Sequence, residues 1–481
     1  MRSTAAGQRK GRALASVAEE QPGPAESRSV VPLFIAVLLI PAVLGSSKTI
    51  FNDGDVSWHI ATGRWIVAHH SIPHGDPFSF TWAGKPWVPI EWLAEVFYAS
   101  AYGLARYGGV AALVTAALIG LHAVVYLNAS RWLRTALLPI IAMDFVLIPM
   151  LLARPHVLTW PLLAFWTWLM LRAREQDRAP PLIAALLMAV WANMHGGFVF
   201  GLAIAGAFAL EALVDSADRI RAFRQWLIFG LCCGAAVFIN GNGVEGVIHP
   251  LRFTQLQMLP LIDEWKPASL SLTPYFFAVL AITLALIAWK RPRLPWVRWL
   301  LLACLVALGL LQVRHQTVLA IVAAMLLPQG FGRGAAEPRE DRTGLWVLGG
   351  AAALLVVARA VMPLTPPDND ANPWHLIAQV PPELRSQPVL NGYSMGGPLI
   401  LSGIRPYVDG RGDMYGDALV VDYSHITHGD AQAFNRAVQR WNIRWAIVPN
   451  GYMGLIELLD QAGWRRIAAD NVGAIYVRPG G

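Results

Sequence analysis

The sequence predicts a polytopic α-helical membrane protein of about eleven transmembrane helices, followed by a small C-terminal α/β domain. Three observations lead to this prediction. The chain of 481 residues is 55% hydrophobic and only 14% charged, unlike a soluble protein. Apolar runs long enough to cross a bilayer recur up to residue 362. Beyond that point the sequence is less apolar and mixes strand-like with helix-like stretches.

The N-terminal segment 1–29 is polar, basic and low in complexity. We expect a disordered cytoplasmic tail that leads into an uncleaved first helix. The net charge of +7 is spread over short loops, which does not indicate nucleic-acid binding. The three cysteines include no CxxC pair, so neither a disulfide framework nor a zinc site is predicted.

The segment 30–362 forms the predicted transmembrane module, because it holds eleven apolar runs of about 15 to 22 residues. The predicted spans lie near 30–48, 100–127, 135–152, 156–171, 180–195, 197–214, 226–240, 274–289, 297–313, 316–329 and 344–362. The 180–214 region is also compatible with one broken helix. With the tail inside, eleven crossings put the C-terminus outside.

The loops support this orientation through their charge. Those predicted to lie inside carry Arg131, Arg134, Arg172, Arg174, Arg178, Arg219, Arg221, Arg224, Lys290, Arg291, Arg293, Arg298, Arg333, Arg339 and Arg342. The opposite loops carry few cations, as the positive-inside rule requires. The sequence therefore predicts a protein of the bacterial inner membrane, with a cytoplasmic N-terminus and a periplasmic C-terminal domain.

The polar residues at membrane level fall mostly on the predicted outer side. The outer connections contain Arg154, His156, Asn193, His195, Asn240, Asn242, Glu245, His249, Asp263, Glu264, Arg314 and His315. Histidines that merely pack in a core need not share one side of a membrane. Ionisable residues at membrane depth are costly, so this one-sided distribution predicts an outward-facing site.

The first outer loop, residues 48–98, is the richest in reactive groups. Asp55, Trp58, His59 and Thr62 follow helical spacing on one face. Proline-containing sequence then interrupts the helix, and Glu91 begins another. We expect two short helices at the membrane surface that hold a polar site between them.

The C-terminal segment 363–481 reads as a periplasmic α/β domain. Its strand-like stretches are PVLN, RPYVDGR, IRWAIVP and RRIAADNVGAIYVRP. The stretches AQAFNRAVQRW and MGLIELLDQAG have helical patterns. The linker PLTPPDNDANP is a credible hinge between the membrane module and this domain.

This arrangement resembles the C-fold (GT-C) glycosyltransferases, which include the protein mannosyltransferases and the bacterial aminoarabinose transferases. The resemblance rests on Asn52-Asp53-Gly54-Asp55 after the first span, the helix IATGRWIVAHHSIP, and GKPWVPIEWL before the second span. The stretches RPH, NMHGGF and VDGRGDMYG are also similar to a bacterial branch of that superfamily. The family opens this loop with Asp-Glu, whereas this chain has Asp-Gly-Asp, which leaves open which aspartate is the base.

The resemblance implies transfer of a sugar from a polyprenyl-phosphate donor to an extracytoplasmic lipid, glycan or protein. In such a reaction a carboxylate takes the proton of the acceptor, and cations stabilise the leaving phosphate. The catalytic candidates are Asp55, then Asp53, with Glu91. The substrate-binding candidates are His59, Trp58, Arg154, His156, His195, Arg314, His315 and Trp92. A divalent cation such as Mg²⁺ or Mn²⁺, held by Asp53, Asp55 and Glu91, is compatible with these residues but not required by their spacing.

Other interpretations stay open. Asp53 is also suited to cap the following helix, and Arg154 and Arg314 to meet lipid headgroups. The G-x-S-x-G motif around Ser394, with Asp409 or Asp413 and His425 or His428, is that of a serine hydrolase, although the domain is too short for that fold. The glycine-rich motif is alternatively a turn that packs over the membrane site. A non-catalytic transporter or assembly component of cell-surface polysaccharide synthesis is the alternative function.

Overall fold

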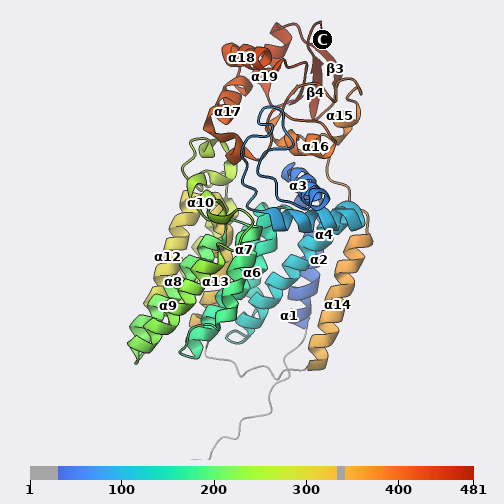
Figure 1. Cartoon of the computed structure of the whole chain (residues 1–481). Helices are drawn as coiled ribbons and strands as arrows, with labels where there is room; N and C mark the ends of the chain where they lie inside the picture. Colours follow the sequence, from blue (N-terminus) through green and yellow to red (C-terminus); the bar gives the residue numbers. More distant parts are fainter. Residues whose placement is uncertain (1–30, 333–341, 481) are drawn as a thin grey trace, which may run out of the picture.

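The computed structural model describes residues 31–332 and 342–480, and the disorder predicted for the tail 1–29 lies outside this part of the chain. The protein is mostly helical, with one small sheet near the C-terminus. Figure 1 shows an upright helical bundle that carries the C-terminal domain at one end. We call this end the domain-facing end of the bundle.

All eleven predicted apolar runs lie in helical segments of this bundle. These segments are α1, η1 and α2 (Val31–Phe34, Ile35–Leu39, Ile40–Gly45), α4 (Trp92–Ser130), α5 with η3 (Leu137–Leu147, Ile148–Met150), α6 (Pro155–Glu175), η4 with α7 (Leu182–Ala185, Leu186–Met194), α8 (Phe198–Asp215), α9 (Arg219–Ala236), α11 (Pro274–Lys290), α12 (Trp296–Leu311), α13 (Gln316–Phe331) and α14 (Arg342–Val361). In the described part of the chain, α4 and α8 are long and apolar enough to cross a membrane, and the other apolar helices are shorter.

The region 180–214 is two helices, because the chain breaks between α7 and α8. His195 has an extended backbone, with φ of −170°, which ends α7 after Met194. Gly196 and Gly197 follow before α8 begins at Phe198. The break brings the His195 side chain to the domain-facing end of the bundle.

Short elements cover the domain-facing end of the bundle. They are η2 (Lys48–Phe51), α3 (Asp55–His69), α10 (Gly243–Phe253), η5 (Leu259–Leu261), η6 (Asp263–Trp265) and η7 (Val313–His315). Figure 1 shows α3 and α10 between the upright helices and the C-terminal domain. The helix predicted from Asp55 is confirmed, and Trp58, His59 and Thr62 are buried, as are residues on its other sides such as Val56 and Ile60.

Helix α4 changes direction near its beginning. Ala105 and Arg106 depart from helical geometry, and Arg106 has a φ of 52°. The first part of α4 therefore lies across the end of the bundle, and the rest runs down into it (Figure 1). As predicted, a helix starts near Glu91, which precedes Trp92 as the N-cap residue.

Two buried ion pairs join helices inside the bundle. His122 of α4 lies 3.1 Å from Asp144 of α5. Arg298 of α12 donates two hydrogen bonds of 2.8 Å to the carboxylate of Glu211 in α8. Arg174 of α6 also contacts Glu211 at 3.2 Å. A buried charge is stable only when it is paired and hydrogen-bonded, so these contacts hold the helices in register.

The C-terminal domain is built on a four-stranded sheet. Its strand order is β1 (Val389–Asn391), β2 (Trp445–Pro449), β4 (Gly473–Val477) and β3 (Arg465–Ala469), with β1 and β2 parallel and the other pairs antiparallel. The helical segments are α15 (Trp374–Ala378), η8 (Tyr393–Met395), α16 (Gly396–Leu401), α17 (Gly412–Thr427), α18 (Ala431–Trp441) and α19 (Met453–Gln461). The α/β prediction is thus confirmed, including both predicted helices.

One predicted strand, RPYVDGR, is wrong, because residues 405–411 form an irregular turn. Side chains satisfy its backbone in place of a neighbouring strand. The amide of Asn391 accepts a 2.8 Å hydrogen bond from the Tyr407 N–H and donates one of 2.8 Å to the Val408 carbonyl. The carboxylate of Asp409 accepts a hydrogen bond from the Arg411 N–H at 3.0 Å. Asn and Asp side chains commonly compete with sheet formation in this way.

The core of the C-terminal domain includes side chains from the other end of the sequence. Trp58 and Trp87, from the first loop, and Met258, from the segment after α10, pack in the same hydrophobic cluster as Leu390 and Tyr415. The boundary between bundle and domain is therefore a packed interface. The functional site described next lies at this interface.

Candidate functional site at the domain-facing end of the bundle

The acidic turn Asn52–Asp55 leads into helix α3, and both carboxylate oxygens of Asp53 accept hydrogen bonds within the protein. Its Oδ1 accepts a hydrogen bond of 3.1 Å from the Asp55 N–H. Its Oδ2 accepts a hydrogen bond from Nε of Arg154. Asp53 therefore bonds to the first residue of the helix and anchors an arginine, but the N-cap residue of α3 is Gly54, so the capping interpretation of Asp53 is not confirmed.

Arg154 is the centre of this charge cluster. Its NH2 lies 2.9 Å from Oδ2 of Asp55, and its NH1 lies 3.3 Å from both carboxylate oxygens of Glu264. Pro155 begins α6, and a residue before proline is driven to an extended backbone. Arg154 accordingly has φ of −119° and ψ of 160°, which directs its side chain away from the helix toward the acidic turn.

The carboxylates around Arg154 differ in their proton affinity. Burial raises the pKa of Asp55 to about 7, although the Arg154 charge favours its ionised form. Glu264 is buried too, but the charges of Arg154 and Arg314 hold its pKa below the ordinary value. Asp55 also turns its Oδ1 toward Gly410 of the C-terminal domain. A carboxylate with a pKa near neutrality is suited to accept a proton during a reaction.

A second group of titratable side chains alternates between acids and imidazoles. His195 Nε2 lies 3.6 Å from Glu91 Oε1, and Glu91 Oε2 lies 3.9 Å from His59 Nε2. Nδ1 of His59 lies 3.3 Å from Glu95, which is almost completely buried. Burial raises the pKa of Glu91 to about 8, against the opposing charge of Arg314. Glu91 thus pairs with histidines and does not join Asp53 and Asp55.

Arg314 differs from Arg154 because it makes no ion pair within residues 31–332 and 342–480. Its guanidinium lies over the ring of Trp265, with Cζ 4.2 Å from the ring centroid. It is partly exposed, and its charge acts on both Glu91 and Glu264. A guanidinium that is held on an aromatic ring and keeps its donors free is suited to bind an anion.

The remaining predicted binding residues surround this cluster. His156 contacts the Met150 carbonyl at 3.0 Å and lies 6.2 Å, between ring centroids, from His195. The ring of His315 lies 5.2 Å from that of Phe200. Trp58 is buried and lies on the His59 ring, at 3.6 Å between centroids. The structure brings these side chains to the same end of the bundle as the charge cluster.

Trp92 has a structural partner. Its indole N–H donates a 2.6 Å hydrogen bond to Oδ1 of Asn193, and the Gly241 N–H donates to the same oxygen at 3.1 Å. The Asn193 amide in turn donates to the carbonyls of Ala189 and Ile239. Trp92 thereby ties the start of α4 to α7 and to the loop after α9.

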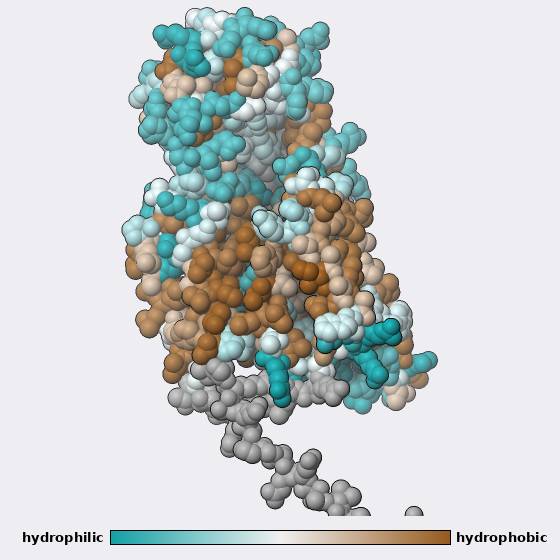
Figure 2. Space-filling view, turned by 180° about the vertical axis from the view of Figure 1, so that it is seen from behind, coloured by the Kyte–Doolittle hydropathy of each residue, from teal (hydrophilic) through white to brown (hydrophobic). Residues whose placement is uncertain are grey.

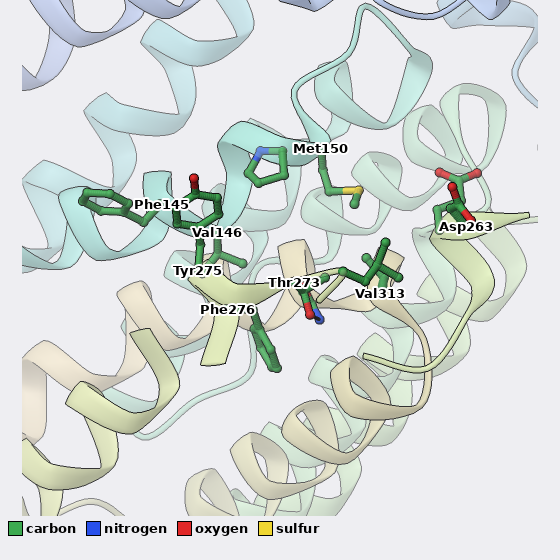
Figure 3. Close-up of a pocket in the computed structure, with 12 residues that line it drawn as sticks. Phe145, Val146, Met150, Asp263, Thr273, Tyr275, Phe276 and Val313 are labelled. Atoms are coloured by element: carbon green, nitrogen blue, oxygen red, sulfur yellow. Dashed lines mark hydrogen bonds between the residues drawn. The ribbon is translucent and has the colours of Figure 1, made fainter. Parts of the chain in front are cut away.

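An apolar cavity of about 120 Å³ reaches the charge cluster from the side of the bundle. Helix α5, the start of α11 and the loops around residues 263–273 and 313 line it, and Glu264 is one of the lining residues. In the close-up of Figure 3, Phe145 and Tyr275 lie at one side of this space and Asp263 at the other. Because Glu264 also pairs with Arg154, the cavity adjoins the cluster.

The sequence analysis did not predict how closely the C-terminal domain covers the acidic turn. A Cβ atom at Gly54 would lie 2.0 Å from the Ser394 carbonyl oxygen, and one at Gly397 would lie 2.1 Å from the Gly54 carbonyl oxygen. The backbones therefore touch, and only glycine fits. The glycine-rich motif around Ser394 is a packing turn over the site, which was the alternative to a hydrolase nucleophile.

The serine hydrolase arrangement is absent from the described structure. Asp409 binds Arg411 and Tyr415, with hydrogen bonds of 2.7 Å and 2.6 Å. His428 contacts the Ser424 carbonyl, and no hydrogen bond among the described residues joins Ser394 to His425 or His428. Ser394 therefore lacks the base that such a nucleophile requires.

The acidic side chains do not form a recognisable metal site. Across residues 31–332 and 342–480, no group of three or more His, Cys, Asp or Glu side chains is arranged to hold a metal ion. Asp53 and Asp55 converge on the guanidinium of Arg154, and Glu91 faces His59 and His195. The Arg154 guanidinium thus lies between the two aspartates.

Comparisons with known proteins do not assign this chain to a family. A scan against models of protein families gives no match, and a search of curated proteins gives none either.

Proposed function

We propose that this chain is a polytopic membrane protein whose helical bundle crosses a bilayer, with the C-terminal domain on the outer side. Its eleven apolar helical segments support this proposal, as do the large apolar side chains exposed around the bundle. Figure 2 shows hydrophobic residues over the bundle, between the hydrophilic C-terminal domain and a hydrophilic rim at the opposite end. Such a belt matches the hydrocarbon layer of a membrane.

Within that membrane we propose a glycosyltransferase that takes a sugar from a polyprenyl-phosphate donor. The observation that carries this function is the position of the Arg154 cluster beside an apolar cavity, together with Arg314, which makes no ion pair within residues 31–332 and 342–480. A lipid phosphate needs both features, because its chain seeks an apolar surface and its headgroup seeks cations. The bacterial inner membrane is the proposed location.

Asp55 is the proposed base. Asp53 already accepts hydrogen bonds at both oxygens, whereas Asp55 gives one oxygen to Arg154 and turns the other toward the C-terminal domain. In the proposed reaction Asp55 takes the proton of an acceptor hydroxyl. The acceptor oxygen then bonds to the anomeric carbon, and the bond from that carbon to the phosphate oxygen breaks.

The charge that develops on the departing phosphate would be stabilised by Arg314 and Arg154. Arg314 is the stronger candidate, since its guanidinium has no carboxylate partner among the residues that the structure describes. Glu91, with a pKa of about 8, would be protonated at neutral pH and able to donate a hydrogen bond to a sugar hydroxyl. The sugar would then lie between Asp55 and Glu91, two acids of the site whose pKa values burial raises.

Native mass spectrometry with undecaprenyl phosphate tests this proposal. We expect saturable binding to the wild-type protein and a loss of about tenfold or more in affinity for Arg314→Ala. Arg252→Ala is the matched control, because Arg252 is exposed at the same end of the bundle and pairs with Glu245. Binding no stronger than that of phosphatidylglycerol, or equal in both variants, would overturn the lipid-phosphate proposal and favour the non-catalytic alternative.

A further inference from the structure

One turn of the C-terminal domain, Asp409–Gly412, touches two side chains of the site. A Cβ atom at Gly410 would lie 1.8 Å from Oδ1 of Asp55, and one at Gly412 would lie 2.7 Å from the hydroxyl oxygen of Tyr393. The two glycines are two residues apart, so their Cα atoms are separated by at most about 7.6 Å. The proposed base and the tyrosine hydroxyl therefore approach the same short stretch of backbone.

The turn is held firmly in place. Arg411, between the two glycines, donates hydrogen bonds to Asp409 within the turn and to Asp76 of the first loop, both 2.7 Å long. At the rim, His249 of α10 lies 2.8 Å from Asp413, and Asp417 accepts a 2.9 Å hydrogen bond from the Met258 N–H. The C-terminal domain is thus fixed to the bundle on both sides of this turn.

The hydroxyl of Tyr393 is available for binding. It makes no hydrogen bond to any residue that the structure describes, and the side chain is half-buried. Burial, followed by the charge of Asp55, raises the pKa of Tyr393 well above its ordinary value. The phenol therefore keeps its proton at neutral pH and is a hydrogen-bond donor beside the carboxylate.

We infer that Tyr393 is a substrate-binding residue whose hydroxyl donates a hydrogen bond to the acceptor, so that the C-terminal domain forms the acceptor wall of the site. This inference rests on the proposed function. The cations that would hold the donor phosphate, Arg154 and Arg314, come from the bundle. The acceptor must approach Asp55 from another side, and Tyr393 lies on the side formed by the C-terminal domain.

The chemistry of this wall also indicates the acceptor class. A phenol beside a carboxylate offers one donor and one acceptor, which together match an alcohol hydroxyl. Asp55, Asp409 and Asp413 act on the Tyr393 phenol with negative charge, and Arg154 opposes them. We therefore expect an uncharged hydroxyl compound, such as a neutral glycan, because the phenol and the carboxylate offer it one donor and one acceptor.

Tyr393→Phe tests the inference, because it removes only the hydroxyl. Tyr407→Phe is the control, since Tyr407 belongs to the same domain and its hydroxyl is near Asp422 and Arg440 rather than Asp55. The assay mixes purified full-length protein with lipid-linked sugars extracted from membranes of the source cells. It then measures release of polyprenyl phosphate at rising amounts of the neutral glycan fraction from the same cells.

For Tyr393→Phe we expect the half-saturating amount of glycan to rise about threefold to tenfold, with undecaprenyl phosphate binding unchanged in native mass spectra. Tyr407→Phe should match the wild type in both measurements. If Tyr393→Phe also matches the wild type, the inference is wrong and the proposed function stands. If the wild-type protein neither binds undecaprenyl phosphate nor releases polyprenyl phosphate, the proposed function fails and the inference falls with it.

Discussion

The guanidinium of Arg411, in the C-terminal domain, lies 2.7 Å from the carboxylate of Asp76, in the first loop, and both side chains are almost completely buried. Asp409 pairs with the same guanidinium at 2.7 Å. The rings of Phe78 and Trp87 flank it, with Cζ 5.2 Å and 4.7 Å from their centroids. This contact joins segments more than 300 residues apart in the chain into one folded unit.

Removing Arg411 should therefore destabilise the protein strongly. Arg411→Ala leaves Asp76 and Asp409 buried without their cation, and breaking a buried pair in this way costs about 3–5 kcal/mol. A large fall in the midpoint of thermal unfolding, measured in detergent, checks this. The control is Arg436→Ala, since Arg436 and Asp422 form an exposed pair that should contribute about 1 kcal/mol or less. Similar midpoints for the two variants would contradict the role given to Arg411.

The proposed activity should depend on the ionisation of Asp55. A general base works only when it is deprotonated, so the rate should rise with pH until about pH 7, the pKa of Asp55, and then level off. Asp55→Asn should abolish turnover without lowering expression. In Asp53→Asn any remaining activity should show its rise at lower pH, because the Asp53 charge helps to raise the Asp55 pKa. A pH–rate profile of each variant measures this, and full activity of Asp55→Asn would refute the assignment.

Glu91 should make stability depend on pH. Burial raises its pKa from 4.5 to about 8, so between these values the folded state binds a proton that the unfolded chain has lost. The stabilisation is complete below about pH 4.5 and is lost as the pH rises through about 8. Glu91→Gln remains neutral, so its unfolding midpoint should fall less than that of the wild type between about pH 6 and 9. Parallel curves for the two proteins would show that Glu91 does not titrate in this range.

The contact between Gly397 and Gly54 should tolerate no side chain. In Gly397→Ala the new methyl group meets the Gly54 carbonyl oxygen, which belongs to the acidic turn and has little freedom to move. Overpacking of this kind costs about 1–3 kcal/mol. We expect proteinase K, which needs no basic residue, to cleave the variant faster in the linker 363–373 between the bundle and the C-terminal domain. Gly451→Ala is the control, because nothing lies within 4 Å of its added Cβ, and equal cleavage rates would disprove the tight contact.

Trp92→Phe should distinguish a structural role from a substrate-binding role. The substitution removes the hydrogen bond from the indole N–H to Asn193, which contributes about 0.5–1.5 kcal/mol. We expect a lower unfolding midpoint and unchanged binding of undecaprenyl phosphate. Weaker binding of a polyprenyl-phosphate sugar at unchanged stability would instead support the substrate-binding role predicted from the sequence.

The sequence predicted local structure well because helices and strands are governed by nearby residues. The apolar runs located the bundle helices, and the spacing from Asp55 located α3. The same reasoning failed for RPYVDGR, whose β-like composition is overridden by the amide of Asn391. Here a tertiary contact of one side chain outweighed the local propensity.

The candidate site was only partly predictable. Asp53, Asp55 and Arg154 were selected from their residue types and positions, and the structure brings them together. Asp53 uses both of its oxygens in hydrogen bonds, whereas Asp55 pairs with Arg154 through only one. This difference depends on atomic geometry, which the sequence does not reveal. The roles of Gly397, Gly410 and Tyr393 depend on contacts across the whole chain, for which spacing in a single sequence carries no signal.

Because the C-terminal domain covers the acidic turn, the site can form only in a certain order. A ribosome makes the turn 52–55 near the start of the chain and Gly397 near its end. Until the C-terminal domain is synthesised, the Phe51 carbonyl lacks its 2.7 Å hydrogen bond from Asn372, and Asp55 lacks the backbone of Gly410 beside it. A nascent chain that already contains every bundle helix therefore still has an incomplete site, and the C-terminal domain must be made before the protein can act.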